Sequence, residues 1–121
     1  MTILESLVPN IRELSEKYEI PVWEDWTRPW ELLDTNLEGN LQSQIMELIS
    51  ISDSIGVPDD VCISEERGRV FIHPDAIIGR FVKIEGPSFI GPMCQLNHCA
   101  LVRAGSWISK GCVVGHSTEI K

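Results

Sequence analysis

Aliphatic residues recur at every sixth position through the last part of the chain. The series runs without interruption through nine members: Ile72, Ile78, Ile84, Ile90, Leu96, Val102, Ile108, Val114 and Ile120. Two positions before each member stands a smaller residue: Val70, Ala76, Val82, Ser88, Cys94, Ala100, Ser106, Cys112 and Thr118. A narrow triangular prism requires this alternation, because the aliphatic side chain fills the interior and the smaller one fits where two faces converge. The pattern predicts a mainly β fold, a parallel β-helix built from hexapeptide repeats.

Residues eighteen positions apart should stack on one another, because three hexapeptides complete one coil and neighbouring strands lie about 4.8 Å apart. This spacing places chemically related residues in columns. Four columns stand out: Glu85, Arg103 and Lys121; Arg80, His98 and His116; Phe71, Phe89 and Trp107; and Gly79, Asn97 and Gly115. The residue types of the last column tolerate the left-handed backbone that a tight corner needs, so we expect that backbone there.

The repeat frame continues upstream after one break. Val57 and Ile63 are six positions apart with Val61 in the small position, and a three-residue excess within residues 65–69 resets the phase to Ile72. We therefore expect residues 56–121 to form a β-helix of about three to four coils, truncated at its C-terminal end.

Residues 1–55 show helical periodicity in place of repeats. A first apolar series at helical spacing is interrupted by Pro9 (Ile3, Leu4, Leu7, Val8, Ile11, Leu14). A second, amphipathic helix is predicted from an N-cap at Thr27 to about Ser50, with Pro29 near its first position. Its apolar stripe is Trp30, Leu33, Leu37, Leu41, Ile45 and Leu48. We expect this α-helical N-terminal segment to cover the open end or one face of the β-helix. Either this Trp-rich segment or a neighbouring subunit should cover the outward aromatic column.

The net charge of −8 is divided unequally along the chain. Residues 1–66 hold fifteen acidic and three basic residues, whereas residues 67–121 hold three acidic and seven basic ones. The acidic total argues against a general nucleic-acid binder, which needs a basic surface, although the basic part could hold a small phosphorylated ligand. No apolar run reaches the roughly 18 residues of a membrane span, and no signal peptide is evident, so a cytoplasmic location without membrane partners is expected.

Three short stretches resemble one family of enzymes. Val102-Arg103-Ala104-Gly105 is similar to an Arg-x-Gly corner, and residues 114–121 are similar to a Val-Gly-Asn-x-x-Glu-x-Lys stretch. Both occur in the left-handed β-helix of sugar-nucleotide N-acyltransferases. The likeness is to the C-terminal half of bifunctional UDP-N-acetylglucosamine pyrophosphorylase/glucosamine-1-phosphate N-acetyltransferase. Residues 29–36 also resemble the Pro-Trp-Asp-Leu-Leu-x-x-Asn element that precedes the β-helix in many sugar-phosphate nucleotidyltransferases.

The resemblance implies a left-handed coil, a homotrimer with its site between subunits, and acetyl-CoA as acyl donor. It also implies that Arg103 and Lys121 bind a sugar phosphate or UDP-sugar. The sequence departs from the family in two respects. It has no Gly-x-Gly run that could cradle a nucleotide triphosphate, and the catalytic His of the family falls after Lys121. We therefore expect a fragment or truncated relative that is inactive by itself.

Other readings compete with each candidate residue. Arg103 and Lys121 could hold an anion between them, or they could form a solvated corner in which Glu85 neutralises Arg103. His98 and His116 are candidate general bases, or surface imidazoles without a catalytic role. Four cysteines (Cys62, Cys94, Cys99, Cys112) contain no C-x-x-C pair and are expected to be reduced, with no metal site.

Two alternatives belong to different functional classes. A non-catalytic trimerisation or regulatory module derived from such an enzyme is compatible with the truncated end. A γ-class carbonic anhydrase would share the fold, but its two zinc-binding His residues five positions apart have no counterpart among His73, His98 and His116.

Overall fold

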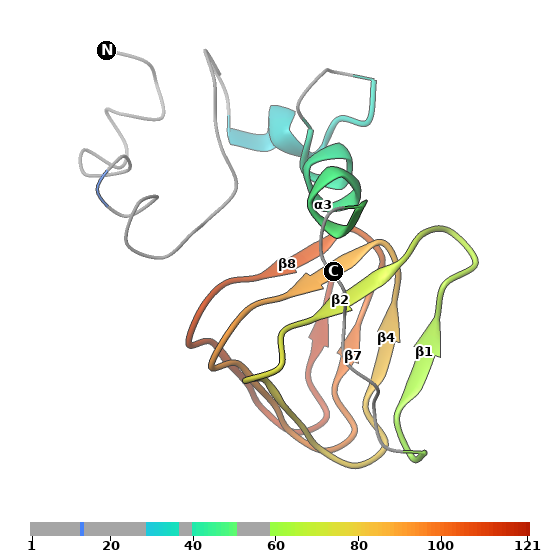
Figure 1. Ribbon diagram of the computed structural model, residues 1–121, viewed down its shortest axis with the longest axis vertical. Helices are drawn as coiled ribbons and strands as arrows, with labels where there is room; N and C mark the ends of the chain where they lie inside the picture. The colour runs from blue at the N-terminus through green and yellow to red at the C-terminus, as the bar shows by residue number, and fades with distance from the viewer. Residues whose placement is uncertain (1–12, 14–28, 37–39, 51–58) are drawn as a thin grey trace.

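The computed structural model describes residue 13 and residues 29–36, 40–50 and 59–121 (Figure 1). This part of the chain is a β-solenoid of about three turns, preceded by one short α-helix. The mainly β fold predicted from the repeats is therefore confirmed, and the left-handed sense of the coil stays a prediction. The structure contains, over these described ranges, no helix long and apolar enough to cross a membrane.

In the described part of the chain, ten short strands form three parallel sheets, which are the three faces of the solenoid. Sheet A contains β1 (Cys62–Ser64), β4 (Lys83–Glu85), β7 (Leu101–Val102) and β10 (Glu119–Ile120). Sheet B contains β2 (Val70–Ile72), β5 (Ser88–Ile90) and β8 (Ser106–Ile108). Sheet C contains β3 (Ile77–Ile78), β6 (Gln95–Leu96) and β9 (Val113–Val114). The chain visits the faces in the order A, B, C, so each strand pairs with the strand one full coil later.

The strand register confirms the coil length of eighteen residues. Ile72 pairs with Ile90 and Ile90 with Ile108, and the same spacing relates the aliphatic residues of the other two sheets. Seven of the nine repeat aliphatics are buried, and Ile78 and Ile120 are partly buried against the same core. The smaller residues Cys112 and Thr118 are exposed because no coil of the described chain lies above the last one.

The upstream extension of the repeat is confirmed at Ile63. This residue pairs with Ile84, which is twenty-one positions later, so the first coil contains three extra residues. Val61 is buried in the small position. The extra residues lie between β1 and β2, where the Glu65 carboxylate accepts a hydrogen bond from the Val70 amide at 3.0 Å. Val57 lies outside the described residues.

The corner backbone differs from the prediction. The left-handed conformation occurs at Phe81, Cys99 and Ser117 (φ 54–61°), two positions after the predicted column. Gly79 serves close packing instead, because a Cβ on it would lie 2.9 Å from the His98 amide nitrogen. The sequence located the corner correctly but assigned the strained residue wrongly.

The predicted continuous helix up to Ser50 is also wrong. The structure has a 3₁₀ helix, η1 (Pro29–Leu33), followed by a separate α-helix, α3 (Leu41–Ser50). The break has a local cause, because Asn40 caps α3 by accepting a hydrogen bond from the Ser43 amide at 3.0 Å. Leu33 belongs to the predicted apolar stripe but is 67% exposed, while Leu32 is buried. The predicted first helix and Thr27 lie outside the described residues.

Helix α3 lies across sheet B, where it covers the aromatic column (Figure 1). The Phe71 and Phe89 rings are parallel with centroids 5.1 Å apart, and Phe89 lies 4.8 Å from Trp107. Ile45 is fully buried against these rings, and Leu41 and Leu48 pack beside it. The prediction offered two coverings for the aromatic column, the N-terminal segment or a neighbouring subunit, and the structure shows the first. The described side chains that cover the column are aliphatic and not the predicted tryptophans. Trp23 and Trp26 lie outside the described residues.

Shortening Ile84 to alanine tests whether the six-residue column holds the solenoid together. Ile84 is fully buried, so Ile84→Ala leaves a cavity, which costs about 2–5 kcal/mol in protein cores. Urea unfolding should show a loss of that size in the free energy of unfolding. Met46→Ala is the matched control, because Met46 is 49% exposed on α3 and its truncation should cost about 0.5 kcal/mol or less. Equal losses in the two variants would contradict the register.

Candidate functional site

A polar hollow of about 290 Å³ lies at the corner where the chain passes from sheet A to sheet B. Its lining contains three cationic and two anionic side chains together with a serine and a glycine: Arg67, Lys83, Arg103, Glu66, Glu85, Ser64 and Gly86. The extra residues of the first coil build one wall, because Glu66 and Arg67 lie between β1 and β2. The insertion that resets the repeat phase therefore shapes this hollow.

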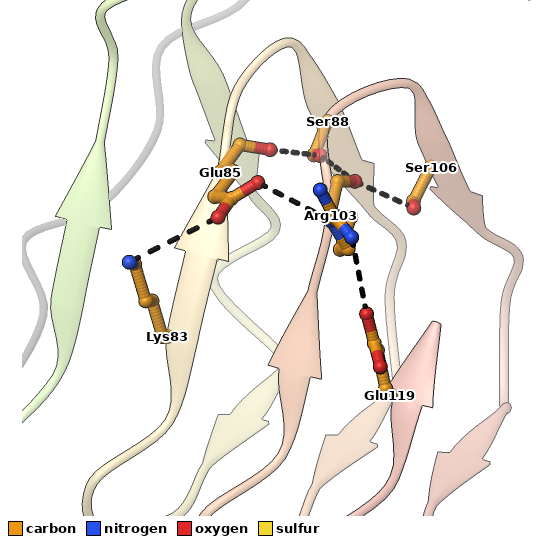
Figure 2. A network of polar contacts seen from close by, with 6 residues as sticks. All are labelled: Lys83, Glu85, Ser88, Arg103, Ser106 and Glu119. Carbon is orange, nitrogen blue, oxygen red and sulfur yellow. Dashed lines mark hydrogen bonds and ion pairs between the residues drawn. The ribbon is translucent and has the colours of Figure 1, made fainter. Parts of the chain in front are cut away.

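Charges of alternating sign occupy the rim of the hollow (Figure 2). The Glu85 carboxylate lies between two cations, 3.9 Å from the Lys83 ammonium and 3.8 Å from Arg103 Nε. On the next coil, Arg103 Nη1 donates a hydrogen bond to Glu119 at 3.4 Å. These ion pairs are long and partly exposed, so each contributes at most about 1 kcal/mol. The Arg103 side chain is 49% exposed and loosely held, so it can change partners.

The backbone beneath Arg103 is fixed much more firmly than its side chain. The Ser106 hydroxyl donates to the Arg103 carbonyl at 2.7 Å, and the Ser88 hydroxyl donates to the Glu85 carbonyl at 2.6 Å (Figure 2). The Arg103 amide donates to the Ile120 carbonyl of the next coil at 2.9 Å. Both serines are buried, so water does not compete with these bonds. The arrangement presents a half-exposed guanidinium from a hydrogen-bonded corner.

The sequence identified Arg103 and its carboxylate partner Glu85, but it missed the other members of this site. Lys83 lies on β4, whose register brings it to the same rim as Arg103 on the following coil. Arg67 belongs to the insertion, to which a six-residue repeat assigns no column. The sequence did contain a sign of the two serines that support this corner, because Ser88 and Ser106 occupy the small position eighteen residues apart. The repeat by itself assigns these two positions to packing alone.

Lys121 lies beside Arg103 along the backbone but lines a different hollow. The register that pairs Ile120 with Val102 places Lys121 one position after the pair, next to Arg103. Lys121 borders a hollow of about 380 Å³ between the N-terminal segment and the third coil, together with Leu33, Leu41, Gln42 and Trp107. The structure thus gives Arg103 carboxylate neighbours, and the two predicted substrate-binding residues line two different hollows of the described chain.

His98 and His116 form the predicted stack at another corner. Their rings are nearly parallel, with an interplanar angle of 8° and centroids 5.3 Å apart. They lie where the chain enters sheet A, whereas Arg103 lies where it leaves, so one chain does not bring the imidazoles to the Arg103 hollow. Parallel ring planes also keep their nitrogen lone pairs from converging on one ion. The described part of the chain contains no group of three or more His, Cys, Asp or Glu side chains that could hold a metal ion.

Adding a methyl group at Gly86 tests how tightly the hollow is built. A Cβ at this position would overlap the Gly68 carbonyl of the insertion, and the Gly86 amide already donates to the Ser64 carbonyl at 2.8 Å. Gly86→Ala must therefore displace backbone, and we expect it to lose about 1–3 kcal/mol in chemical denaturation. Gly115→Ala is the control, because its nearest contact would be an ordinary 3.4 Å from the Thr118 hydroxyl. An unchanged midpoint for Gly86→Ala would show that the insertion adjusts freely.

Comparisons with protein-family models, with curated proteins and with solved structures found no match to this chain. The β-solenoid fold therefore stands on the repeat and on the strand register. The function has to be argued from the geometry of the site and from the short resemblances in the sequence.

Proposed function

We propose that this chain is the β-helix module of a sugar-nucleotide or amino-sugar acyltransferase, and that the Arg103 hollow binds the phosphate of a sugar phosphate or UDP-sugar. The acyl donor in this proposal is acetyl-CoA, and the assembly is a homotrimer with a left-handed coil. The donor, the trimer and the handedness come from the resemblance of residues 102–105 and 114–121 to that family. The observation that carries the ligand proposal is the cluster of three cations around one polar hollow.

The charges of the hollow favour a compact anion. Among the lining side chains, three cations (Arg67, Lys83, Arg103) exceed two carboxylates (Glu66, Glu85) by one charge, which Glu119 balances through its contact with Arg103. An anion that displaces Glu119 from Arg103 meets a concave, polar surface with three cations. A phosphate can accept two parallel hydrogen bonds from a guanidinium at about 2.7–2.9 Å. These contacts are shorter than the present 3.8 Å and 3.4 Å separations from Arg103 to Glu85 and Glu119. A phosphate would therefore displace the carboxylates as the main partner of Arg103.

Acyl transfer also needs a base for the acceptor amine, and the candidates for that role lie elsewhere on this chain. His98 and His116 occupy the opposite end of the sheet A strands from Arg103. In a threefold assembly the corner of a neighbouring copy would have to supply the base and the acetyl-CoA contacts. By itself, one chain provides the acceptor-binding part of the proposed reaction.

A second candidate function is a non-catalytic trimerisation module, and an exposed apolar surface favours it. Ile77 and Val113 project from sheet C and are each more than 60% exposed. Phe81 and Met93, at the two corners that border this sheet, are similarly exposed. Ile77 and Val113 lie on either side of Gln95 in this sheet. Four large, exposed apolar side chains on this sheet and its bordering corners are unusual on a monomer surface. We propose that this apolar face packs against other copies of the chain.

Removing the Arg103 guanidinium should weaken ligand binding. A charge-assisted contact to phosphate contributes about 1.5–3 kcal/mol, so Arg103→Ala should weaken binding of glucosamine 1-phosphate or UDP-N-acetylglucosamine by about tenfold to a hundredfold. Arg103→Lys should recover part of the loss, because lysine cannot make the two-pronged contact. Isothermal titration calorimetry measures both, and thermal unfolding should show nearly unchanged melting temperatures.

Two further variants make the binding experiment specific to the hollow. Glu85→Gln removes the carboxylate that competes for Arg103 and Lys83, so it should strengthen phosphate binding. Arg80→Ala removes an exposed arginine that pairs with Asp60 at a different corner, and it should leave affinity unchanged. If Arg103→Ala and Arg80→Ala weaken binding equally, the effect is one of overall charge and the proposed site is wrong.

Sedimentation equilibrium tests the assembly. The chain should have the mass of three copies at micromolar concentration, and Val113→Lys should dissociate it, because a lysine at the apolar face would have to lose its hydration. Met46→Lys is the matched control, since Met46 is an exposed apolar residue on α3 and away from sheet C. A monomeric wild-type protein would contradict both candidate functions that depend on a threefold assembly.

A further inference from the structure

The three outer faces of the solenoid differ in what they present to solvent. Sheet B is covered by α3, and the outer side of sheet A carries charged side chains such as Lys83 and Glu119. The outward positions of sheet C are uncharged: Ile77 on β3, Gln95 on β6 and Val113 on β9. Burying sheet C against a partner therefore removes no charged group from water.

Two large apolar residues border sheet C in a backbone conformation that disfavours them. Phe81, at the corner between sheets C and A, has a φ of 59°, and Met93, at the corner between sheets B and C, has a φ of 60°. Glycine adopts this left-handed conformation most easily, and Gly111 does so one coil after Met93. Both side chains are more than 60% exposed, so burial within the chain offsets little of the strain. A strained and exposed apolar residue points to a contact outside the chain.

The same two corners carry opposite charges on one coil. Asp75 lies at the Met93 corner, eighteen residues before Met93, and Arg80 immediately precedes Phe81 at the other corner. Both side chains are exposed, 65% for Asp75 and 81% for Arg80. Arg80 Nε lies 3.4 Å from Asp60, and a guanidinium has further donors for a second carboxylate. One edge of sheet C is thus apolar and acidic at this level, and the other is apolar and basic.

We propose that three copies of the chain form a parallel ring with sheet C facing the threefold axis, in which the Met93 corner of each copy contacts the Phe81 corner of the next. This inference rests on the threefold assembly proposed above and adds the residues that make the contact. A threefold ring requires a heterologous interface, in which two unlike surfaces of the chain meet. The corner that carries Arg103 lies opposite sheet C and outside this contact, so ligand binding there can be measured separately.

The heights of these residues along the solenoid agree in a parallel ring. Asp75 and Arg80 are five residues apart on the same coil, so the carboxylate of one copy meets the guanidinium of the next. Lys110 shares the Met93 corner but lies two coils after Asp75, so it is not level with Arg80. Met93 follows Phe81 by twelve residues, which is less than the rise of about 4.8 Å for one coil. The thioether therefore reaches the neighbour's aromatic ring, a favourable contact for sulfur.

Chemical cross-linking tests which corners meet. Asp75→Cys and Arg80→Cys are made in separate full-length chains, because an exposed ion pair contributes little to association and its loss should leave the ring intact. The exposed native cysteines (Cys62, Cys99, Cys112) are replaced by serine in both chains. The two chains differ in mass through a tag and are refolded together. A short bifunctional maleimide should join position 75 of one chain to position 80 of the other, with no 75–75 or 80–80 product.

Glycine substitutions test the two apolar anchors. Phe81→Gly and Met93→Gly relieve the left-handed strain and remove the contact, so each should weaken association about tenfold to a hundredfold, as expected for a central apolar contact. Circular dichroism should show an unchanged fold. Cys99→Gly is the matched control, because Cys99 takes the same conformation one coil after Phe81 and loses only a small side chain. Sedimentation equilibrium should show that this control associates nearly as the wild type does.

The outcomes separate this inference from the function proposed for the Arg103 hollow. A protein with the mass of three copies that gives 75–75 or 80–80 products, or no 75–80 product, overturns the contact and leaves the threefold assembly standing. Glycine variants that associate as well as wild type also overturn it. A wild-type protein without the mass of three copies contradicts the ring itself. In each case, titration of glucosamine 1-phosphate against Arg103→Ala still decides whether the hollow binds phosphate.

Discussion

From β2 onward the solenoid depends on parallel backbone pairing between coils of equal length. Because each strand pairs in register with the strand one coil later, every side chain is placed above a residue of fixed sequence separation. This constraint produces the aliphatic core, since Ile72, Ile90 and Ile108 can only stack if each coil has eighteen residues. It also places each residue of the outer surface next to the residue eighteen positions later in the sequence. The chemistry of the protein is therefore arranged in columns.

Each column has to satisfy the physical chemistry of its own residue types. Apolar columns inside the prism gain from burial, and the outer aromatic column gains in the same way once α3 covers it. A column of like charges would be unfavourable, and the corner at Arg103 avoids this with Glu85 on the preceding coil and Glu119 on the following strand. The same corner also has backbone carbonyl groups that need hydrogen-bond donors. The Ser88 and Ser106 hydroxyls donate to the Glu85 and Arg103 carbonyls.

The polar hollow forms at an irregularity in the repeat. The three extra residues of the first coil could not continue a flat face, so they form a wall over the next corner and create the polar hollow. Gly86 is required there because the insertion carbonyl passes directly over it. The proposed anion site thus arises from a departure from ideal stacking.

Spacing along the chain determined the fold of residues 59–121, because a parallel solenoid is fixed by the period of its aliphatic positions and the prism tolerates no other phase. The same spacing correctly placed the His98–His116 stack and the aromatic column. It did not determine which corner residue takes the left-handed backbone, because that choice depends on contacts such as the one between Gly79 and the next coil.

The tertiary structure alone decided the rest of the candidate site. The helix break before Leu41 follows from an Asn40 cap that outweighs a continuous apolar stripe. Arg67 lies in the same hollow as Lys83 and Arg103 because it belongs to an insertion that the repeat does not predict. Lys121 lines a different hollow, although the register places it next to Arg103. A period specifies which backbone positions are neighbours. The direction of long, charged side chains is set by the local balance of partners, which a period does not contain.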